Sequence, residues 1–423
     1  MLTAIANAFR VPELRKKILF TLAIIALYRV GSYIPVPGVD TAAIEAQVNN
    51  AATLNLLNLF SGGALSQFAV FSLGIMPYIT SSIIMQLLQG VIPKVEQWAK
   101  EGEAGQRKIT QITRYMTLGI ATMSSLGLLT VFRSLGVLPL GGNGAPPTWF
   151  TSTVIVITLI AGTALIMWFG ELITQRGIGN GMSLLIFASI VSRFPQVLWQ
   201  SVEFGNGLFT LLMIVIVVFI IAAIVTMERG QRRIPVQYAK RVVGRRVYGG
   251  SGTYIPLKIN GANVVPIIFA SALLYFPTQL LQLIPNPPAW LTSFANSLAS
   301  GPVNWTFEFV LIVFFTYFYT ALVFNPIDLS DNLRKSGGFI PGVRPGITTV
   351  RYIENVLNRI TLPGAFFLGA IAVVPSIVFS ITQNSLVQQF GGTSILIMVG
   401  VALETMTQIE SQLKMRHYDG FFK

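Results

Sequence analysis

The sequence contains no cysteine, and its single histidine, His417, lies near the C-terminal end. Without cysteine there is no disulfide, thiol nucleophile or thiolate metal site. One histidine cannot supply the pair that H-E-x-x-H zinc sites need, and no lysine follows a glycine, which excludes a Walker A nucleotide loop. We therefore expect no enzymatic activity, metal or cofactor, and any ATP that drives the function must be bound by another polypeptide.

Charge is also scarce. Only 11% of the residues are charged, whereas soluble domains carry about a quarter, and 53% are hydrophobic, with a mean hydropathy of +0.66. High hydrophobicity excludes intrinsic disorder. A membrane-spanning helix needs about 20 apolar residues to cross the hydrocarbon layer, so a chain of 423 residues can hold many spans. The composition predicts a polytopic all-α membrane protein.

Apolar runs between charge clusters predict ten transmembrane helices. They are Ile18 to Ile34, Leu73 to Gly90, Ile109 to Phe132, Val154 to Ile173, Met182 to Trp199, Leu208 to Met227, Val264 to Leu283, Phe307 to Phe324, Ile360 to Ile381 and Ser394 to Leu413.

The positive charges predict the orientation of these spans. Of the 29 Lys and Arg residues, all but Arg29, Arg133 and Arg193 fall on one side, which the positive-inside rule makes cytoplasmic. Both termini are then cytoplasmic, and the first apolar run is a retained span. The predicted regions are an interfacial segment (1–17), an N-terminal half (18–200), a C-terminal half (201–413) and a cytoplasmic tail (414–423). Five spans per half permit two inverted five-helix repeats with a site or pore between them.

One apolar segment does not look like a simple span. Residues 54–70 contain Gly62 and Gly63 in mid-run, together with Asn, Ser and Gln side chains. Such a segment suits a re-entrant or plugging helix inside protein, because lipid would leave its broken backbone unsatisfied. An external amphipathic loop helix fits equally well.

Two cytoplasmic loops carry most of the remaining information. The loop at 228–258 holds eight basic residues and includes Arg246 to Ile255, which has the composition of a short hairpin. Its charge fits either the positive-inside rule alone or a dock for an anionic partner, nucleic acid or acidic protein. The loop at 328–359 contains GGFIPGVRPG, whose glycines and prolines predict a fixed turn that projects Arg344.

Taken together, these motifs resemble the SecY family, the protein-conducting channels of bacterial plasma membranes. The resemblance is spread in order over nearly the whole chain. It rests on Leu59 to Leu88, Arg176 to Val191, Glu228 to Tyr248, Val264 to Ser271, Tyr319 to Gly346 and Phe390 to Ile397.

The resemblance implies two five-helix halves around an hourglass pore, with 54–70 as the plug. The implied plug residues are Leu59, Phe60, Ser61, Gly62, Gly63, Ala64 and Leu65. The implied pore ring is Ile75, Ile79, Met182, Ile186, Ile268 and Ile397. The implied lateral gate, between the spans at 73–90 and 264–283, includes Ile83, Gln86, Leu87, Asn263, Val264 and Ile267. Met182 departs from the branched aliphatic residue frequent in the family, but it leaves the ring apolar.

The implied function is translocation of unfolded secretory polypeptides across the bacterial plasma membrane, with release of transmembrane segments into lipid through the gate. Implied partners are SecE and often SecG in the membrane, the motor ATPase SecA, the ribosome, signal sequences, precursor polypeptides and membrane lipids. The residues matching the docking positions are Arg233, Arg245, Arg246 and Arg344. The alternative is an inverted-repeat secondary transporter of a small solute, which predicts polar or charged residues at the midplane.

Overall fold

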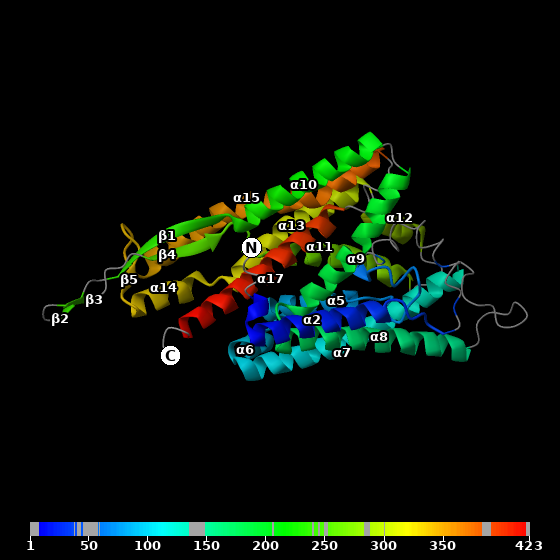
Figure 1. Cartoon of the computed structure of the whole chain (residues 1–423), viewed down its shortest axis with the longest axis horizontal. Helices are drawn as coiled ribbons and strands as arrows, with labels where there is room; N and C mark the ends of the chain where they lie inside the picture. The colour runs from blue at the N-terminus through cyan, green and yellow to red at the C-terminus, as the bar shows by residue number, and fades with distance from the viewer. Residues whose placement is uncertain are drawn as a thin grey trace, which may run out of the picture. The chain divides into compact units, whose positions relative to one another are not determined.

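The computed structural model describes the chain as helices with a small β region (Figure 1). The described residues are 8–37, 39, 44, 58, 60–134, 149–204, 207–238, 241–243, 246–248, 253–282, 288–299, 301–382 and 391–419.

Each of the ten expected spans falls on one helix. These helices are α2 (Pro12–Gly31), α5 (Met76–Val91), α7 (Glu103–Ser134), α8 (Trp149–Arg176), α9 (Gly181–Phe204), α10 (Gly207–Arg229), α11 (Val265–Gln282), α13 (Pro302–Val323), α15 (Ile347–Thr382) and α17 (Gly392–Asp419). Shorter helices lie between them: α6 (Pro93–Lys100), α12 (Ala289–Ala299) and α14 (Pro326–Lys335). The predicted all-α membrane fold is confirmed.

Five of these helices, within the described residues, are long and apolar enough to cross a membrane by themselves. They correspond to α7, α8, α13 with its extension to Lys335, α15 and α17, and shorter apolar helices run over Gly181–Pro195 and Val265–Leu274.

Many hydroxyl side chains inside the spans donate to a carbonyl of their own helix. Thr117 Oγ1 donates to the Thr113 carbonyl at 2.7 Å, Ser125 Oγ to Ala121 at 2.7 Å, and Thr316 Oγ1 to Ile312 at 2.6 Å. Because hydrocarbon offers no partner for a polar group, this back-bonding lets Ser and Thr occur in spans without a partner from another helix.

The chain divides into two compact units. Unit 1 comprises residues 1–207, 271–305 and 401–423, and unit 2 comprises 208–270 and 306–400. The predicted halves at 18–200 and 201–413 stay a prediction.

Unit 2 carries a three-stranded antiparallel sheet in the order β4-β1-β5, formed by β1 (Gln231–Tyr238), β4 (Thr253–Lys258) and β5 (Gly338–Phe339) (Figure 1). β1 and β4 pair from Gln231↔Lys258 to Val236↔Thr253. The sheet packs on α14 and the first turns of α15 through a core of Ile234, Leu257, Ile340 and Ile353. We call these elements the sheet platform.

The strands pair differently from the expected hairpin. β3 (Arg246–Tyr248) pairs with β2 (Arg241–Val243), and β4 pairs with β1, so the segment 246–255 contributes to two separate ladders. The predicted strands form, but the prediction that they pair with each other was wrong, because composition alone does not choose strand partners.

Candidate functional site

The described part of the expected plug is built from turns. Helical backbone ends at Phe60, and residues 61–75 form consecutive turns that lead into α5. Gly62 and Gly63 have φ of 67° and 90°, the left-handed region that glycine adopts without strain. The glycine pair therefore ends the helix instead of interrupting it. We call residues 60–75 the plug segment; Leu59 lies outside the described residues.

Two side chains of α2 hold the glycine turn of the plug segment. Arg29 Nη1 donates to the Gly62 carbonyl at 2.8 Å, and its Nη2 donates to the Tyr33 hydroxyl at 3.1 Å. The Tyr28 hydroxyl lies 2.7 Å from Ser189 Oγ of α9 and 3.3 Å from the Ser61 carbonyl oxygen. A Cβ at Gly62 would lie 2.9 Å from Arg29 Nη1 and 3.0 Å from Ser189 Cα, so only glycine fits between α2 and α9.

Aromatic packing buries the second part of the plug segment. Phe68 is fully buried and meets the Phe132 ring of α7 edge-on at 5.1 Å, while Phe71 stacks on Tyr28 at 5.7 Å. Two glycines let α2 and α8 lie close against the plug segment. A Cβ at Gly31 would collide with the Phe71 ring, and one at Gly162 of α8 would collide with the Val70 carbonyl oxygen.

The rest of the plug segment is held by scattered hydrogen bonds. The Val36 amide donates to the Phe68 carbonyl and the Val70 amide to the Ile34 carbonyl, both at 2.9 Å. Ser72 Oγ donates to Ala69 at 2.6 Å. These bonds satisfy a buried backbone that has neither a helix nor a ladder of its own.

The residues of the predicted pore ring lie in both units. Ile75 immediately precedes α5, Ile79 lies in α5, and Met182 and Ile186 lie in the first turns of α9, all in unit 1; Ile268 of α11 and Ile397 of α17 belong to unit 2. Ile75, Ile79, Ile186, Ile268 and Ile397 are buried. The half-buried Met182 packs over Gly170 of α8, where any Cβ would collide with its sulfur. The ring as a whole stays a prediction.

The predicted gate residues are likewise divided. Ile83, Gln86 and Leu87 lie on α5 in unit 1. Asn263 and Val264 immediately precede α11, and Ile267 lies in its first turn, all in unit 2. Gln86 Nε2 donates to Ser82 Oγ at 3.4 Å, and its buried Oε1 has no hydrogen-bond partner within the described structure. Val264 packs against Gly400 of α17, where a Cβ would collide with it.

Two of the predicted docking arginines belong to the sheet platform. Arg233 is exposed on β1, and its guanidinium carbon lies 4.8 Å from the centre of the Tyr254 ring on β4. Arg344 is exposed on the predicted turn, and its carbonyl accepts from Thr349 Oγ1 at 2.9 Å. β5 pairs with the end of β1, which brings the two loops into one sheet. Arg246 lies in β3, and Arg245 lies outside the described residues.

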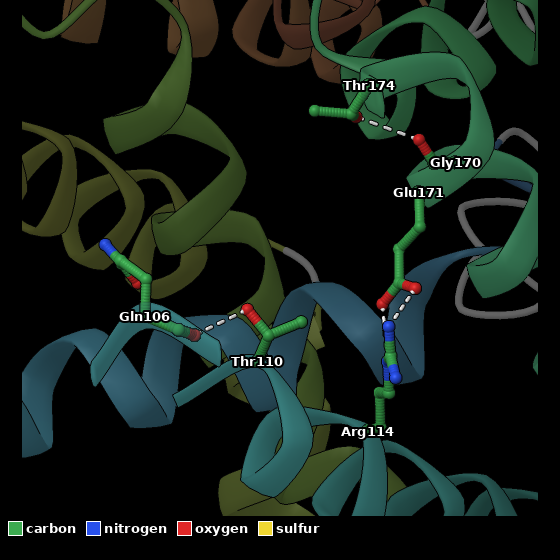
Figure 2. A network of polar contacts seen from close by, with 6 residues as sticks. All are labelled: Gln106, Thr110, Arg114, Gly170, Glu171 and Thr174. Carbon is green, nitrogen blue, oxygen red and sulfur yellow. Dashed lines mark hydrogen bonds and ion pairs between the residues drawn. The ribbon is translucent and has the colours of Figure 1, made fainter. Parts of the chain in front are cut away.

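A polar network joins α7 to α8 in unit 1 (Figure 2). Arg114 donates to both carboxylate oxygens of Glu171, at 2.8 and 2.5 Å, and the Glu171 side chain is only 14% exposed. Thr174 Oγ1 donates to the Gly170 carbonyl and accepts from the Gly181 amide, both at 2.9 Å, which ties α8 to the start of α9. The Arg114–Glu171 ion pair borders a cavity of about 380 Å³. The cavity is lined by Arg114, Met167, Trp168, Glu171, Leu172 and Gln175.

These features define a helical membrane protein with a buried turn segment inside one unit and a basic sheet platform on the other. The SecY family matches residues 69–406. Translocase subunits SecY of Streptomyces scabiei and Mycobacterium tuberculosis are 50% and 47% identical over 437 and 441 residues, with all of each chain covered. The chain belongs to the SecY family.

Solved structures share the fold at low sequence identity. A protein-conducting channel has a TM-score of 0.62 at 16% identity, covering 93% of this chain and 91% of that one. A SecY structure whose plug domain is described as stabilising the closed state of its channel has a TM-score of 0.66 at 18% identity, with the same coverage. Sec61 in a canine ribosome-channel complex has a TM-score of 0.61 at 16% identity, again with the same coverage.

Sequence reasoning missed the residues that hold the plug segment. Tyr28, Arg29 and Ser189 are far apart in the chain, and Arg29 stood out only as a basic residue on the wrong side for the positive-inside rule. That exception was the available signal, because an arginine kept at the end of a span opposite the basic loops needs a local acceptor.

Proposed function

We propose that the chain is a protein-conducting channel that moves unfolded secretory polypeptides across the bacterial plasma membrane and releases transmembrane segments sideways into lipid. The observation that carries this is the end-to-end similarity to translocase subunits at about half identity, on a chain that has the channel fold. The solute-transporter alternative has no support from these relatives. Both termini are then in the cytoplasm.

In this proposal the apolar ring of Ile75, Ile79, Met182, Ile186, Ile268 and Ile397 is the constriction. Apolar side chains offer a passing chain no fixed hydrogen bonds, and a narrow apolar neck dewets and so resists ion conduction. The plug segment seals the resting channel. A signal helix that binds between α5 and α11 opens it, because a ligand shifts a conformational equilibrium only by preferring one state.

The basic platform docks the cytoplasmic partners. Ribosomes and the motor SecA both present negative charge to Arg233, Arg245, Arg246 and Arg344, and SecE and SecG join in the membrane. Arg344→Glu should block motor-driven export while the channel still accumulates in the membrane. Arg351→Glu, at another exposed arginine on α15, is the matched control, and normal export by the Arg344 variant would refute the docking role.

The channel itself is tested by crosslinking, which the lack of cysteine makes clean. A single Cys replaces Ile79, a precursor with one Cys is stalled in mid-export, and disulfide formation is measured in native membranes. We expect a crosslink that requires a functional signal sequence, and none from a Cys at Ile157, which is 60% exposed on α8. If small thiol reagents label position 79 but the precursor never reaches it, the constriction is wrong and solute transport becomes the better hypothesis.

A further inference from the structure

The base of the sheet platform continues directly into the helices of unit 2 (Figure 1). The Ile259 amide donates to the Gly230 carbonyl at 3.0 Å, which extends the β1–β4 ladder by one bond beyond the Gln231↔Lys258 pair, to the end of α10. The backbone of α15 also meets this point, since a Cβ at Gly364 would lie 2.8 Å from the Ile259 carbonyl oxygen. The ladder, α10 and α15 are therefore joined at one place.

A single asparagine side chain connects this junction to the start of α11 by hydrogen bonds. Asn260 is 2% exposed, and its Nδ2 donates to Glu228 Oε1 of α10 at 2.7 Å and to the Asn263 carbonyl at 2.9 Å. Both amide hydrogens are thus used. Asn263 has φ of 52°, a left-handed conformation that asparagine tolerates better than most residues, and α11 begins two residues later. We call Asn260, Glu228 and Asn263 the clasp.

We propose that Asn260 and Glu228 are positioning residues that make the link between the sheet platform and α11 stiff, so that a partner docked on the platform displaces the start of the gate helix. The proposal rests on the proposed function of α11 and the platform. Both amide hydrogens of Asn260 are bonded, while its buried Oδ1 has no hydrogen-bond partner in the described structure. The two donated bonds restrain the link, so it transmits a displacement that an unbonded link would absorb. The carboxylate of Glu228 suits this task because a hydrogen bond to a charged acceptor is roughly twice as strong as a neutral one.

The test separates docking from gate opening in the full channel complex. Asn260→Asp keeps the side-chain size but replaces the donor with an acceptor that faces Glu228 and the Asn263 carbonyl. The probe is a ribosome translating a precursor, and a Cys at Leu87 of α5 reports whether the signal helix has entered the gate. We expect ribosome affinity to stay unchanged while the crosslink yield falls about fivefold or more, the lower range of typical coupling between sites.

Two further variants keep the test decisive. In Asn260→Asp with Glu228→Gln, the Gln amide can donate to the Asp carboxylate, so part of the crosslink yield should return. Glu354→Gln, at an exposed glutamate on α15, is the matched control and should behave as the parent chain.

Three other outcomes have distinct meanings. If affinity and crosslinking fall together, the clasp only folds the platform and the inference is wrong. If neither changes, the link transmits nothing and the inference is also wrong. If the parent chain itself gives no signal-dependent crosslink, the proposed gate fails, whatever the clasp does.

Discussion

The plug segment is largely buried and the sheet platform is exposed on one face over an apolar core, and their backbones are held in different ways. The platform has a continuous antiparallel ladder from Gln231 to Val236 and its own apolar core. The plug segment has turns, scattered hydrogen bonds and two long side chains from α2. A ladder breaks cooperatively, whereas separate contacts can be exchanged one by one for contacts with another chain. The comparison fits the proposed roles of the two regions, a rigid one for docking and a releasable one for sealing.

The platform should depend most on its core. Ile353→Ala removes a fully buried side chain from α15, and such truncations cost about 2–5 kcal/mol. Limited proteolysis of β1 and β4 in the reconstituted channel should become at least about tenfold faster, because 1.4 kcal/mol corresponds to that factor. Ile347→Ala, at a residue 74% exposed near the start of the same helix, should have no such effect. Equal cleavage of both variants would show that the platform core does not hold the sheet.

The plug segment should depend next on Arg29. Arg29→Gln loses the charged donor to the Gly62 carbonyl, and hydrogen bonds to charged groups contribute about 1.5–3 kcal/mol when well buried; partial exposure of Arg29 puts the effect at the lower end. We expect higher ion conductance of the resting channel in planar bilayers. Arg133→Gln removes an equivalent charge from the end of α7 and serves as the control. Unchanged conductance in the Arg29 variant would mean that this bond does not hold the seal.

Overpacking at α8, on the side of the plug segment where Val70 lies, should loosen the segment. Gly162→Ala places a methyl group on the Val70 carbonyl, and inserted groups of this kind cost about 1–3 kcal/mol. A Cys at Ser66 should then be labelled faster by a water-soluble thiol reagent. Gly119→Ala on α7 has open space around the new Cβ and should leave labelling unchanged. If the two variants label alike, α8 does not confine the segment.

The smallest expected effect is at the Tyr28 hydroxyl. Tyr28→Phe keeps the stacking on Phe71 and loses the hydroxyl contacts with Ser189 and with the Ser61 carbonyl oxygen, each worth about 0.5–1.5 kcal/mol or less. The resting conductance should rise less than in Arg29→Gln. Combining Tyr28→Phe with Ser189→Ala should add little beyond Tyr28→Phe alone, because the Tyr28–Ser189 bond is already lost in that variant. Fully additive changes would indicate that the two hydroxyls act separately.

The positions of the spans could be predicted from the sequence because apolar length and charge act locally. Hydropathy located all ten helices, and the glycine pair correctly marked a break at residues 62 and 63. The glycine pair did not show whether the segment is a broken helix or a run of turns, because that depends on the side chains that surround its backbone. Arg29 and Gly62 show why: the carbonyl that Arg29 binds is offered only after the helix ends at Phe60.

The sheet platform shows the same limit over a longer distance. β5 supplies only Gly338 and Phe339, and it pairs with Gln237 and Tyr238, about one hundred residues earlier in the chain. No local pattern specifies such a pairing, because two residues carry no alternation to read. The Gly and Pro punctuation predicted a fixed turn around Arg344, but it gave no indication that the turn shares a sheet with Arg233.

The two ends of the plug segment meet. A Cβ at Gly74 would lie 3.1 Å from Ser61 Cα, so the two ends of the segment lie at nearly the same point, as in an Ω-loop. Because the two ends of such a loop already lie together, residues inserted between them need not change the spacing of α2 and α5, and they cost chain entropy only logarithmically. We expect its length to vary more freely among relatives than the helices that surround it.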